Sequence, residues 1–275
     1  MTNSMSAPTQ TPQSFAVRRI GRINWMGVWT MYAKEVRRFW KVSTQTIVAP
    51  AVTTLLFLAI FALALGGGGR TTWEAPFSAF LGPGLIVMAI LQNAFANTSS
   101  SLIIAKVQGN IVDVLMPPLS PGELTFGYAM GGLTRGVVVG VAVTLLMLPF
   151  VPLTLSHPWA ILYFGVSTAL MLSLIGVLTG IWADKFDHTA AVTNFIVTPL
   201  SLLSGTFYTI DRLPGVWRTM SHLNPFFYLI DGFRFGFLGR ADSDIAIGVA
   251  VTLALNSALW LACYALFKRG YKLRY

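Results

Sequence analysis

Residues 158–182 read PWAILYFGVSTALMLSLIGVLTGIW, an uncharged and mostly apolar stretch. A bilayer core of about 30 Å is crossed by roughly 20 apolar residues in a helix, because each residue adds about 1.5 Å. This stretch is therefore long enough to cross a membrane. A helix suits lipid because it satisfies its own backbone hydrogen bonds.

Five further stretches of similar character flank this one. The six predicted spans cover residues 45–65, 77–105, 125–149, 158–182, 189–210 and 245–267. Of the 275 residues, 55% are hydrophobic and 11% are charged, whereas a typical soluble domain is about 25% charged. The sequence predicts an all-α membrane protein with six transmembrane helices, in contact with membrane lipid.

Charge is concentrated at the two ends of the chain. The formal net charge is +9, which could indicate a nucleic-acid partner, but the basic residues lie where membrane topology would put them. They precede the first span (Arg18, Arg19, Arg22, Lys34, Arg37, Arg38 and Lys41) and follow the last (Lys268, Arg269, Lys272 and Arg274). Basic flanks stay on the cytoplasmic side. We therefore expect both termini in the cytoplasm, an even number of spans and no nucleic-acid partner.

The chain divides into four predicted parts. Residues 1–22 are rich in Ser, Thr, Gln and Pro and predict a disordered tail. Residues 23–41 predict an amphipathic helix lying in the membrane interface, because one face carries aromatic and apolar residues: Trp25, Trp29, Tyr32, Val36 and Phe39. A soluble helix packed on a partner is the alternative. Residues 45–267 form the transmembrane domain, and residues 268–275 form a basic cytoplasmic tail.

Polar residues form a stripe on the second span. Asn93, Asn97 and Ser101 follow one another at intervals of four, so they share one helix face. Polar groups within lipid must face protein or water. The stripe therefore either forms hydrogen bonds between helices or lines a substrate path. On the third span, Arg135 is expected to reach the membrane surface or to pair with a polar group.

Two segments between spans are helical but too short or too polar to cross lipid. Residues 107–116 predict a short helix that ends before Pro117 and Pro118. The segment 211–244 predicts two short helices, since Pro214 and Pro225 suit first helical positions and Asn224 suits a helix cap.

The sequence lacks the motifs of catalysis and nucleotide binding. It contains no His-Glu-x-x-His and no Gly-x-Ser-x-Gly, and its three histidines are scattered. No Lys follows a Gly, so a phosphate-binding Walker A loop is excluded. We therefore predict no enzyme activity, no catalytic residue, no metal site and no cofactor in this chain. Uphill transport would need an energy-supplying partner.

Two segments between the predicted spans carry recognisable motifs. After the fifth span the chain reads SGTFY at 204–208, Leu-Pro at 213–214, Trp217, Asn-Pro at 224–225, and then Asp231 and Arg234. After the second span it reads Gln-Gly-Asn at 108–110, followed by Leu115, Pro118 and Glu123. These segments resemble those of ABC-2 type permeases, close to the small bacterial inner-membrane transport permeases, and the resemblance extends over nearly the whole chain.

This resemblance implies a homodimer in the bacterial inner membrane, bound to two copies of a separate ATP-binding cassette subunit that carries ATP and Mg. It implies an exporter of an amphipathic, lipid-like or glycan-type substrate. The loop after the second span would be the ATPase coupling helix, with Val107, Gln108, Gly109, Ile111, Asp113 and Leu115. The segment after the fifth span would be a re-entrant outer gate, with Phe207, Pro214, Trp217, Asn224, Pro225, Asp231 and Arg234.

One departure from the family pattern lies in the predicted coupling helix, where Gln108 and Asn110 flank the glycine in place of a charged residue. Contact with the ATPase could then depend on shape and on Asp113. We expect charge reversal at Asp113, or proline at Ile111, to uncouple transport. The competing interpretations are a channel or facilitator without an ATPase, a membrane anchor without transport, and an outer segment without a gating role.

Overall fold

The computed structural model describes residues 21–65, 71–72, 75–210 and 214–272, and the predicted tail 1–22 lies almost wholly outside them. The regular secondary structure of the described residues is helical apart from two short strands, β1 (Thr71–Thr72) and β2 (Ala75–Pro76), which pair antiparallel. Five helical stretches within the described residues are long and apolar enough to cross a membrane: Thr44–Ala64, Phe77–Val107, Pro121–Met147, Pro158–Trp182 and Ile245–Arg269. The prediction of an all-α membrane protein is confirmed.

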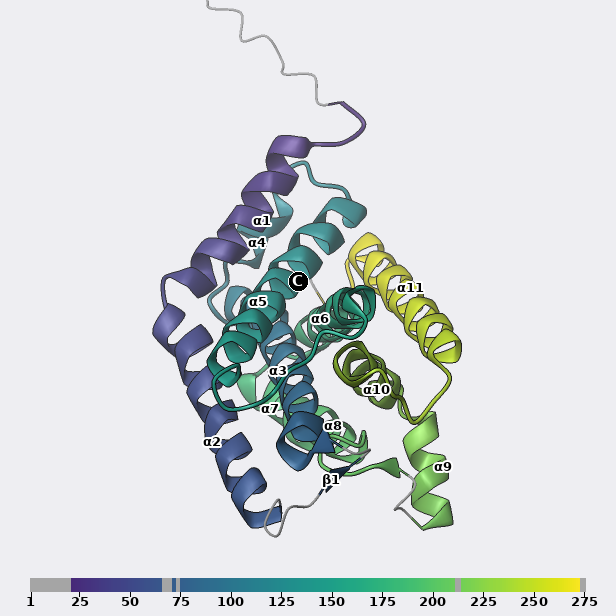
Figure 1. Cartoon of the computed structure of the whole chain (residues 1–275). Coiled ribbons are helices and arrows are strands. Elements are labelled where there is room, and N and C mark those ends of the chain that lie inside the picture. Colours follow the sequence, from purple (N-terminus) through teal and green to yellow (C-terminus); the bar gives the residue numbers. More distant parts are fainter. Residues whose placement is uncertain (1–20, 66–70, 73–74, 211–213, 273–275) are drawn as a thin grey trace, which may run out of the picture.

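Helix α3 (Phe77–Val107) is the centre of the bundle. It packs against α5 (Pro121–Met147), α6 (Pro158–Trp182) and α10 (Pro225–Leu238). Its most apolar part is 83% buried, whereas the most apolar parts of the stretch Thr44–Ala64, which contains most of α2 (Ala49–Leu65), and of α11 (Ile245–Arg269) are 17% buried. The two outlying helices leave most of their apolar side chains, such as Leu56 and Leu253, on the surface (Figure 1). A surface of that kind suits lipid.

Three glycines of α5 allow the central helices to approach closely. A side chain at Gly136 would meet the Ala94 Cβ atom at 3.0 Å and the Ile90 carbonyl oxygen at 3.1 Å, both on α3. Gly132 and Gly140 face α3 in the same way, and Gly132 also faces α6. Thr98 and Ser173 then join the helices through hydrogen bonds to backbone carbonyls, from Thr98 Oγ1 to Ser173 O and from Ser173 Oγ to Ala129 O. Small residues and hydroxyl bonds of this type hold helices together in lipid.

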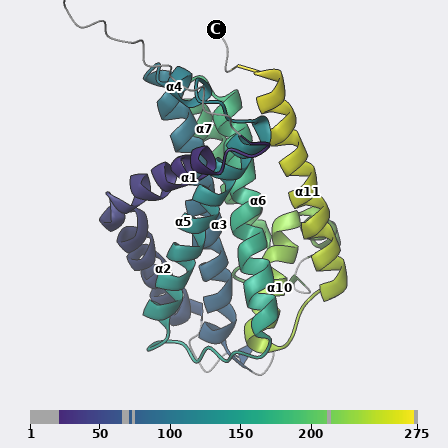
Figure 2. The ribbon, with the colours of Figure 1, turned by 90° about the horizontal axis from the view of Figure 1, so that it is seen from above.

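Helix α1 (Trp25–Trp40) lies across the other helices, as Figure 2 shows. It packs against α5, and its buried residues are Val28, Met31, Glu35 and Phe39. The aromatic face predicted from the sequence therefore divides. Phe39 is buried against protein, whereas Trp25 and Trp29 are 71% and 66% exposed, positions from which they could enter the headgroup region.

The predicted fifth span, residues 189–210, differs from the structure in its bounds. An uninterrupted helical run covers residues 186–203 and consists of α7 (Phe186–Val192), a π-helical turn η2 (Thr193–Val197) and α8 (Thr198–Leu203); it is not among the five stretches named above. The helix ends early because Gly205 has a φ of 75°, which turns the chain away from the helix axis. A similar π-helical turn, η1 (Thr44–Val48), precedes α2.

The segment between α8 and α11 forms two helices, α9 (Gly215–Leu223) and α10. Pro225 is the first residue of α10 and Asn224 caps it through the Phe226 amide at 3.0 Å. Pro214 was predicted as the first residue of its helix, but it is the N-cap of α9, one residue before the first helical residue, Gly215. In Figure 1, α9 projects from the bundle while α10 lies within it. The 14-residue α10 is mostly buried, more deeply than a surface loop would be.

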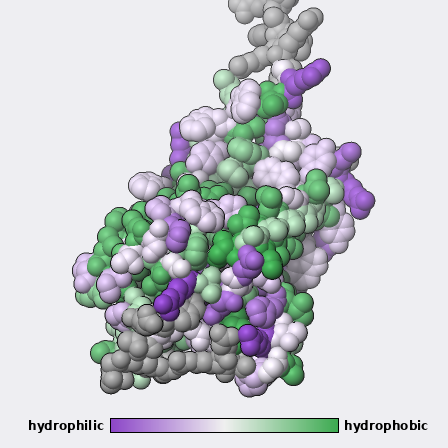
Figure 3. Space-filling model, turned by 45° about the vertical axis from the view of Figure 1, so that its right-hand side comes forward, coloured by the Kyte–Doolittle hydropathy of each residue, from purple (hydrophilic) through white to green (hydrophobic). Residues whose placement is uncertain are grey.

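The short helix α4 (Ile111–Leu115), α7 and the C-terminal end of α11 lie at one end of the bundle, which we call the α4 end (Figure 2). Figure 3 shows apolar side chains gathered over the middle of one face, with hydrophilic side chains toward its upper and lower parts.

Candidate functional site: the α4 end, a polar groove and the α10 junction

Helix α4 is an exposed turn of helix at the tip of α3. Ile111 and Val114 are buried and attach it to the bundle, while Val112, Asp113 and Met116 are exposed. Gly109, with a φ of 74°, makes the reversal between α3 and α4. Of the predicted coupling residues, Val107, Gln108, Gly109 and Asp113 are exposed and Ile111 and Leu115 face inward. An exposed apolar pair beside a carboxylate suits a protein partner.

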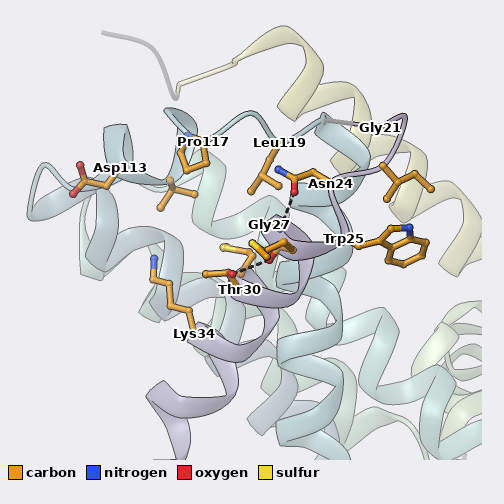
Figure 4. A pocket seen from close by; sticks show the side chains of 13 residues that line it. Gly21, Asn24, Trp25, Gly27, Thr30, Lys34, Asp113, Pro117 and Leu119 are labelled. Carbon is orange, nitrogen blue, oxygen red and sulfur yellow. Dashed lines mark hydrogen bonds between the residues drawn. The ribbon is translucent and has the colours of Figure 1, made fainter. Parts of the chain in front are cut away.

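A hollow of about 550 Å³ separates α4 from α1 (Figure 4). Asp113 and Pro117 lie on one wall, and Thr30 and Lys34 of α1 lie on the other. Gly27 and Leu119 both line the hollow, and a side chain at Gly27 would meet the Leu119 methyl group at 2.6 Å, so α1 and the α4–α5 connection touch there. The α4 end therefore offers a recess with one charge of each sign on its rim.

Glu123 ties the start of α1 to the start of α5. Its carboxylate accepts hydrogen bonds from the backbone amide of Asn24 and, at 2.6 Å, from that of Ser120. Ser120 Oγ accepts from the Glu123 amide in return, which completes a capping box at the first turn of α5. The α1 helix and the connection after α4 are thus held together at the α4 end.

A buried charged cluster, which we call the α1 anchor, fixes α1 to the middle of α3. Glu35 is fully buried and accepts from Ser101 Oγ at 2.6 Å and from Asn97 Nδ2 at 3.4 Å. Arg38 forms a 3.2 Å ion pair with Glu35 and donates to Ser100 Oγ at 3.1 Å. Two members of the predicted polar stripe, Asn97 and Ser101, therefore bond to α1.

The third member of the stripe faces another helix. Asn93 accepts from Arg135 at 3.0 Å, so Arg135 pairs with α3. Pairing was one of the two outcomes expected for an arginine within a span. Asn93 also lines a groove between α2, α3 and α8. The structure thus brings Asn97 and Ser101 together at the α1 anchor and places Asn93 one turn away, beside the groove.

A second polar cluster closes the α4 end between α3, α6 and the chain end. Lys106 is buried, and its ammonium donates to the backbone carbonyls of Ile181, at 2.9 Å, and Ala183 at the end of α6. Asp184 accepts from Lys106 at 3.4 Å and from Lys272 at 2.7 Å. The hydrogen bond from Lys272 lowers the pKa of Asp184 below its ordinary value. A cation at a helix C-terminus is favourable.

At the opposite end, Arg234 of α10 is fully buried and joins three elements. It donates to the carbonyl oxygens of Gly205, at 2.8 Å, and Phe80, at 3.3 Å, and its guanidinium lies 3.9 Å from the centre of the Phe80 ring. Asp231, one turn earlier, accepts from the Asp242 amide at 2.8 Å and from Ser243. These two residues hold α10 to the α8–α9 turn, to α3 and to the start of α11.

The remaining predicted gate residues divide between this junction and the surface. Asn224 donates to the Leu200 carbonyl at 2.7 Å, and the Phe207 ring lies 4.5 Å from that of Phe61 on α2. Pro214 and Trp217 lie on the exposed α9 instead. The motif that marks this segment in the sequence is thus largely a packing motif.

Sequence reasoning missed Glu35 and the role of Lys106. Glu35 is the one acidic residue among the basic residues of 23–41, and it lies four residues from both Met31 and Phe39, on the buried face. That spacing was a usable signal. Lys106 gave no comparable signal, because two of its partners are backbone carbonyls and the third, Asp184, lies 78 residues away in the sequence.

The fold therefore defines a polytopic α-helical membrane protein with a crosswise helix, a short exposed helix at the tip of its central helix, and a buried helix, α10, before its last span. The chain belongs to the ABC-2 type transporter family, whose model matches residues 26–238.

Curated relatives agree with this assignment. The chain is 39% identical over 251 residues to the inner membrane transport permease YadH of Escherichia coli strain K12, covering 91% of this chain and 98% of YadH. It is 23% identical over 259 residues to nodulation protein J of Rhizobium leguminosarum bv. viciae, covering 90% of this chain and 95% of that protein. Membership of the family implies an ATP-binding cassette partner.

Proposed function

We propose that this chain is the permease subunit of an ATP-binding cassette exporter in the bacterial inner membrane. Two copies would form the pathway, and two ATP-binding subunits would drive it. The proposal is supported by family membership and by the name of the relative YadH. The observation that carries it is the exposed α4, whose Val112, Asp113 and Met116 stand at the tip of the central helix α3.

In this proposal the α4 end is cytoplasmic. It collects basic residues of α1, among them Lys34 and Arg37, and those near the end of α11, including Lys268 and Lys272. Such a concentration of positive charge favours the cytoplasmic side. The fifth crossing would be made by α7, η2 and α8 together, giving six crossings, and α9 and α10 would form the re-entrant outer segment.

The ATPase would dock on α4 and in the recess beside α1. Nucleotide binding to the ATPase would displace α4 as a rigid body. The displacement would be transmitted directly to α3, and to α1 through the hydrogen bonds of Glu123. The α1 anchor would then transmit it to the middle of α3. Interfaces of this kind switch between discrete packings, so a small displacement at one end can alter the exposure of a cavity elsewhere.

The path would follow the groove between α2, α3 and α8, on which Asn93 lies. The α10 junction, held by Asp231 and Arg234, would close the outer end. Two copies would enclose the path, because polar side chains in a span must face protein or water. The cargo would be amphipathic, lipid-like or glycan-type, and would move outward.

The test is purification of the chain from its native host in mild detergent, with and without substitutions on α4. We expect an ATPase subunit to copurify, and Asp113→Lys with Val112→Asp to abolish its stimulation by the permease while membrane insertion is retained. The control is Lys185→Asp, a charge reversal at the same end but on the α6–α7 connection. A chain that transports at normal rates without any ATPase is a facilitator, and the proposal then fails.

The structure changes one variant suggested by the sequence. Ile111 is the first residue of α4, where proline is well tolerated because its missing amide has no helical partner. Ile111→Pro would therefore act through loss of a buried side chain. Substitutions at the exposed Val112 and Asp113 test coupling without that complication.

A further inference from the structure

A groove of about 460 Å³ lies within the membrane-crossing part of the bundle. Its walls come from three spans: Gln45 and Thr53 from η1 and α2, Gln92 and Asn93 from α3, and Thr193 from η2. An apolar wall formed by Phe57, Leu85 and Met88 continues the same groove. A polar strip beside an apolar strip within one hollow is the lining expected for an amphiphile.

The described lining residues carry no charge. All of the polar ones are amides or hydroxyls. Arg135, which is not among the lining residues, donates to Asn93 and so presents its charge to that amide. An anionic or cationic headgroup entering this groove would leave water without meeting an opposite charge, which is costly in a medium of low dielectric constant.

Two amides in the groove are open. Gln92 lies in the middle of the 31-residue α3 and is exposed, as is Gln45 on η1. Among the described residues, neither side-chain amide has a hydrogen-bond partner, whereas Thr53, Thr54 and Asn93 donate to carbonyls of their own helices. An unpaired amide facing hydrocarbon costs free energy. Gln92 and Gln45 therefore need water or a ligand in front of them.

Both π-helical turns of the described chain border this groove. Gln45 is the second residue of η1 and Thr193 is the first residue of η2. The turns lie on different spans, far apart in sequence. Isolated π-helical turns are uncommon and recur at functional sites. The position of both π-helical turns beside one groove therefore supports a functional role for the groove, independently of the chemistry of its lining.

We propose that this groove binds the uncharged, hydroxyl-rich headgroup of an amphiphile, such as a sugar carried on an apolar chain. A glutamine amide both donates and accepts hydrogen bonds, which matches a hydroxyl group, and two amides on facing walls can hold several hydroxyls at once. The wall with Phe57 and Leu85 takes the apolar chain. The inference names the substrate class for the proposed export path and so depends on that proposal.

The experiment uses the full chain in lipid nanodiscs, without ATPase, and four photoreactive dodecyl probes. They share one chain and carry glucoside, phosphocholine, sulfate or trimethylammonium headgroups. The compared proteins are the unchanged chain, a Gln45→Leu and Gln92→Leu double variant, and Ser257→Leu as control. Ser257 is exposed on α11 outside the groove, and its hydroxyl bonds to the Leu253 carbonyl of its own helix.

The glucoside probe should label peptides of α2, α3 and α8 and should bind roughly tenfold more tightly than the charged probes. The double variant should lose most of that preference, and Ser257→Leu should keep it. Equal binding of all headgroups, a preference for a charged one, an unaffected double variant or absence of groove labelling would each overturn the inference.

Failure of the exporter proposal can be distinguished from failure of the headgroup-binding proposal. An Asp113→Lys variant that loses ATPase coupling should still bind the glucoside, because α4 is remote from the groove. If no ATPase copurifies but the glucoside preference holds, the exporter proposal fails and the site stands. If coupling holds and the headgroup preference is absent, the exporter proposal stands and the substrate class is wrong.

Discussion

Ser101 Oγ donates a 2.6 Å hydrogen bond to Glu35 Oε1, and with it the middle of the central helix α3 is bonded to the crosswise helix α1. Glu35 is fully buried, and Arg38 balances its charge at 3.2 Å. The same α1 helix begins beside α4. A rigid connection therefore runs from the α4 end to the depth of the bundle, through charged groups that have no other partners of opposite sign in the described chain.

We expect Glu35→Ala to destabilise the chain by about 2 kcal/mol. A fully buried pair that loses one partner costs about 3 to 5 kcal/mol, and the 29% exposure of the Arg38 side chain reduces this. Glu35→Gln should cost less, since an amide oxygen still accepts from Ser101. Thermal unfolding in nanodiscs measures the effect, with the exposed Arg37→Ala as control. Equal unfolding temperatures of Glu35→Ala and Arg37→Ala would contradict the role assigned to the α1 anchor.

The close approach of α3 and α6 depends on Gly176. A Cβ atom there would meet the Phe95 carbonyl oxygen at 2.6 Å, and backbone does not yield as a flexible side chain can. Gly176→Ala should therefore cost about 1 to 3 kcal/mol through overpacking. Gly122→Ala is the matched control, because its added methyl group would meet the Tyr264 ring at 3.9 Å. Unfolding midpoints that agree for the two variants would show that the helices can separate at no cost.

Lys106→Met should destabilise the α4 end. It leaves the carbonyl oxygens of Ile181 and Ala183 without their buried donor, a loss of about 1 to 3 kcal/mol. Hydrogen exchange should increase at the end of α6 and not in α10. An unchanged exchange rate at residues 179–184 would mean that water replaces the ammonium fully.

The pH dependence of the same cluster follows from Asp184. Lys272 holds the pKa of Asp184 below its ordinary value of 3.8. A carboxyl group with a lower pKa in the folded chain stabilises the fold above its unfolded-state pKa, and the contribution is lost as pH falls through the folded-state value. The difference in unfolding midpoint between the unchanged chain and Asp184→Asn should stay constant from about pH 8 to pH 5 and shrink below about pH 4. A difference that disappears near neutral pH would rule out this carboxylate as its source.

Arg234→Met should unfold the junction around α10. The planar guanidinium donates hydrogen bonds to the carbonyl oxygens of both Gly205 and Phe80. Each hydrogen bond from a charged donor contributes about 1.5 to 3 kcal/mol to stability. Arg234→Lys should recover little, because a single ammonium cannot reproduce the fork. Proteolysis between α8 and α11 reports the change. If the Arg234→Met variant resists proteolysis as well as the unchanged chain, Arg234 does not hold the α10 junction together.

Span positions could be predicted from hydrophobic length alone, and Pro158–Trp182 agrees at both ends with the stretch read from the sequence. At the fifth span, predicted as 189–210, the bounds are shifted, because the helical run covers 186–203 and ends at Leu203, two residues before a positive-φ glycine. The average hydrophobicity of a stretch carries no information about the backbone conformation of single residues. The two π-helical turns were likewise invisible, since no residue pattern specifies the extra residue in a turn.

The sequence indicated which side chains would form polar contacts, but it did not indicate which residues would be their partners. A stripe at Asn93, Asn97 and Ser101 had to find hydrogen bonds, yet the identity of Glu35 and Arg135 as partners depends on how three helices cross. The partners of Lys106 were harder still to predict, because two are backbone carbonyls, which every residue has, and the third is the distant Asp184. The sequence motif at 204–234 did locate the α10 junction, although Pro214 and Trp217 lie on the exposed α9.

The most direct test of the account is site-specific cross-linking of α4 to the ATPase. Cys263 is the single cysteine of the chain and is buried, so Cys263→Ala gives a background without reactive thiols. Val112→Cys on α4 and Trp217→Cys on α9 then place one exposed thiol at each end of the bundle. The account predicts that a short bifunctional reagent joins the Val112→Cys chain to the copurified ATPase and leaves the Trp217→Cys chain unlinked. Cross-links from α9, with none from α4, would contradict it.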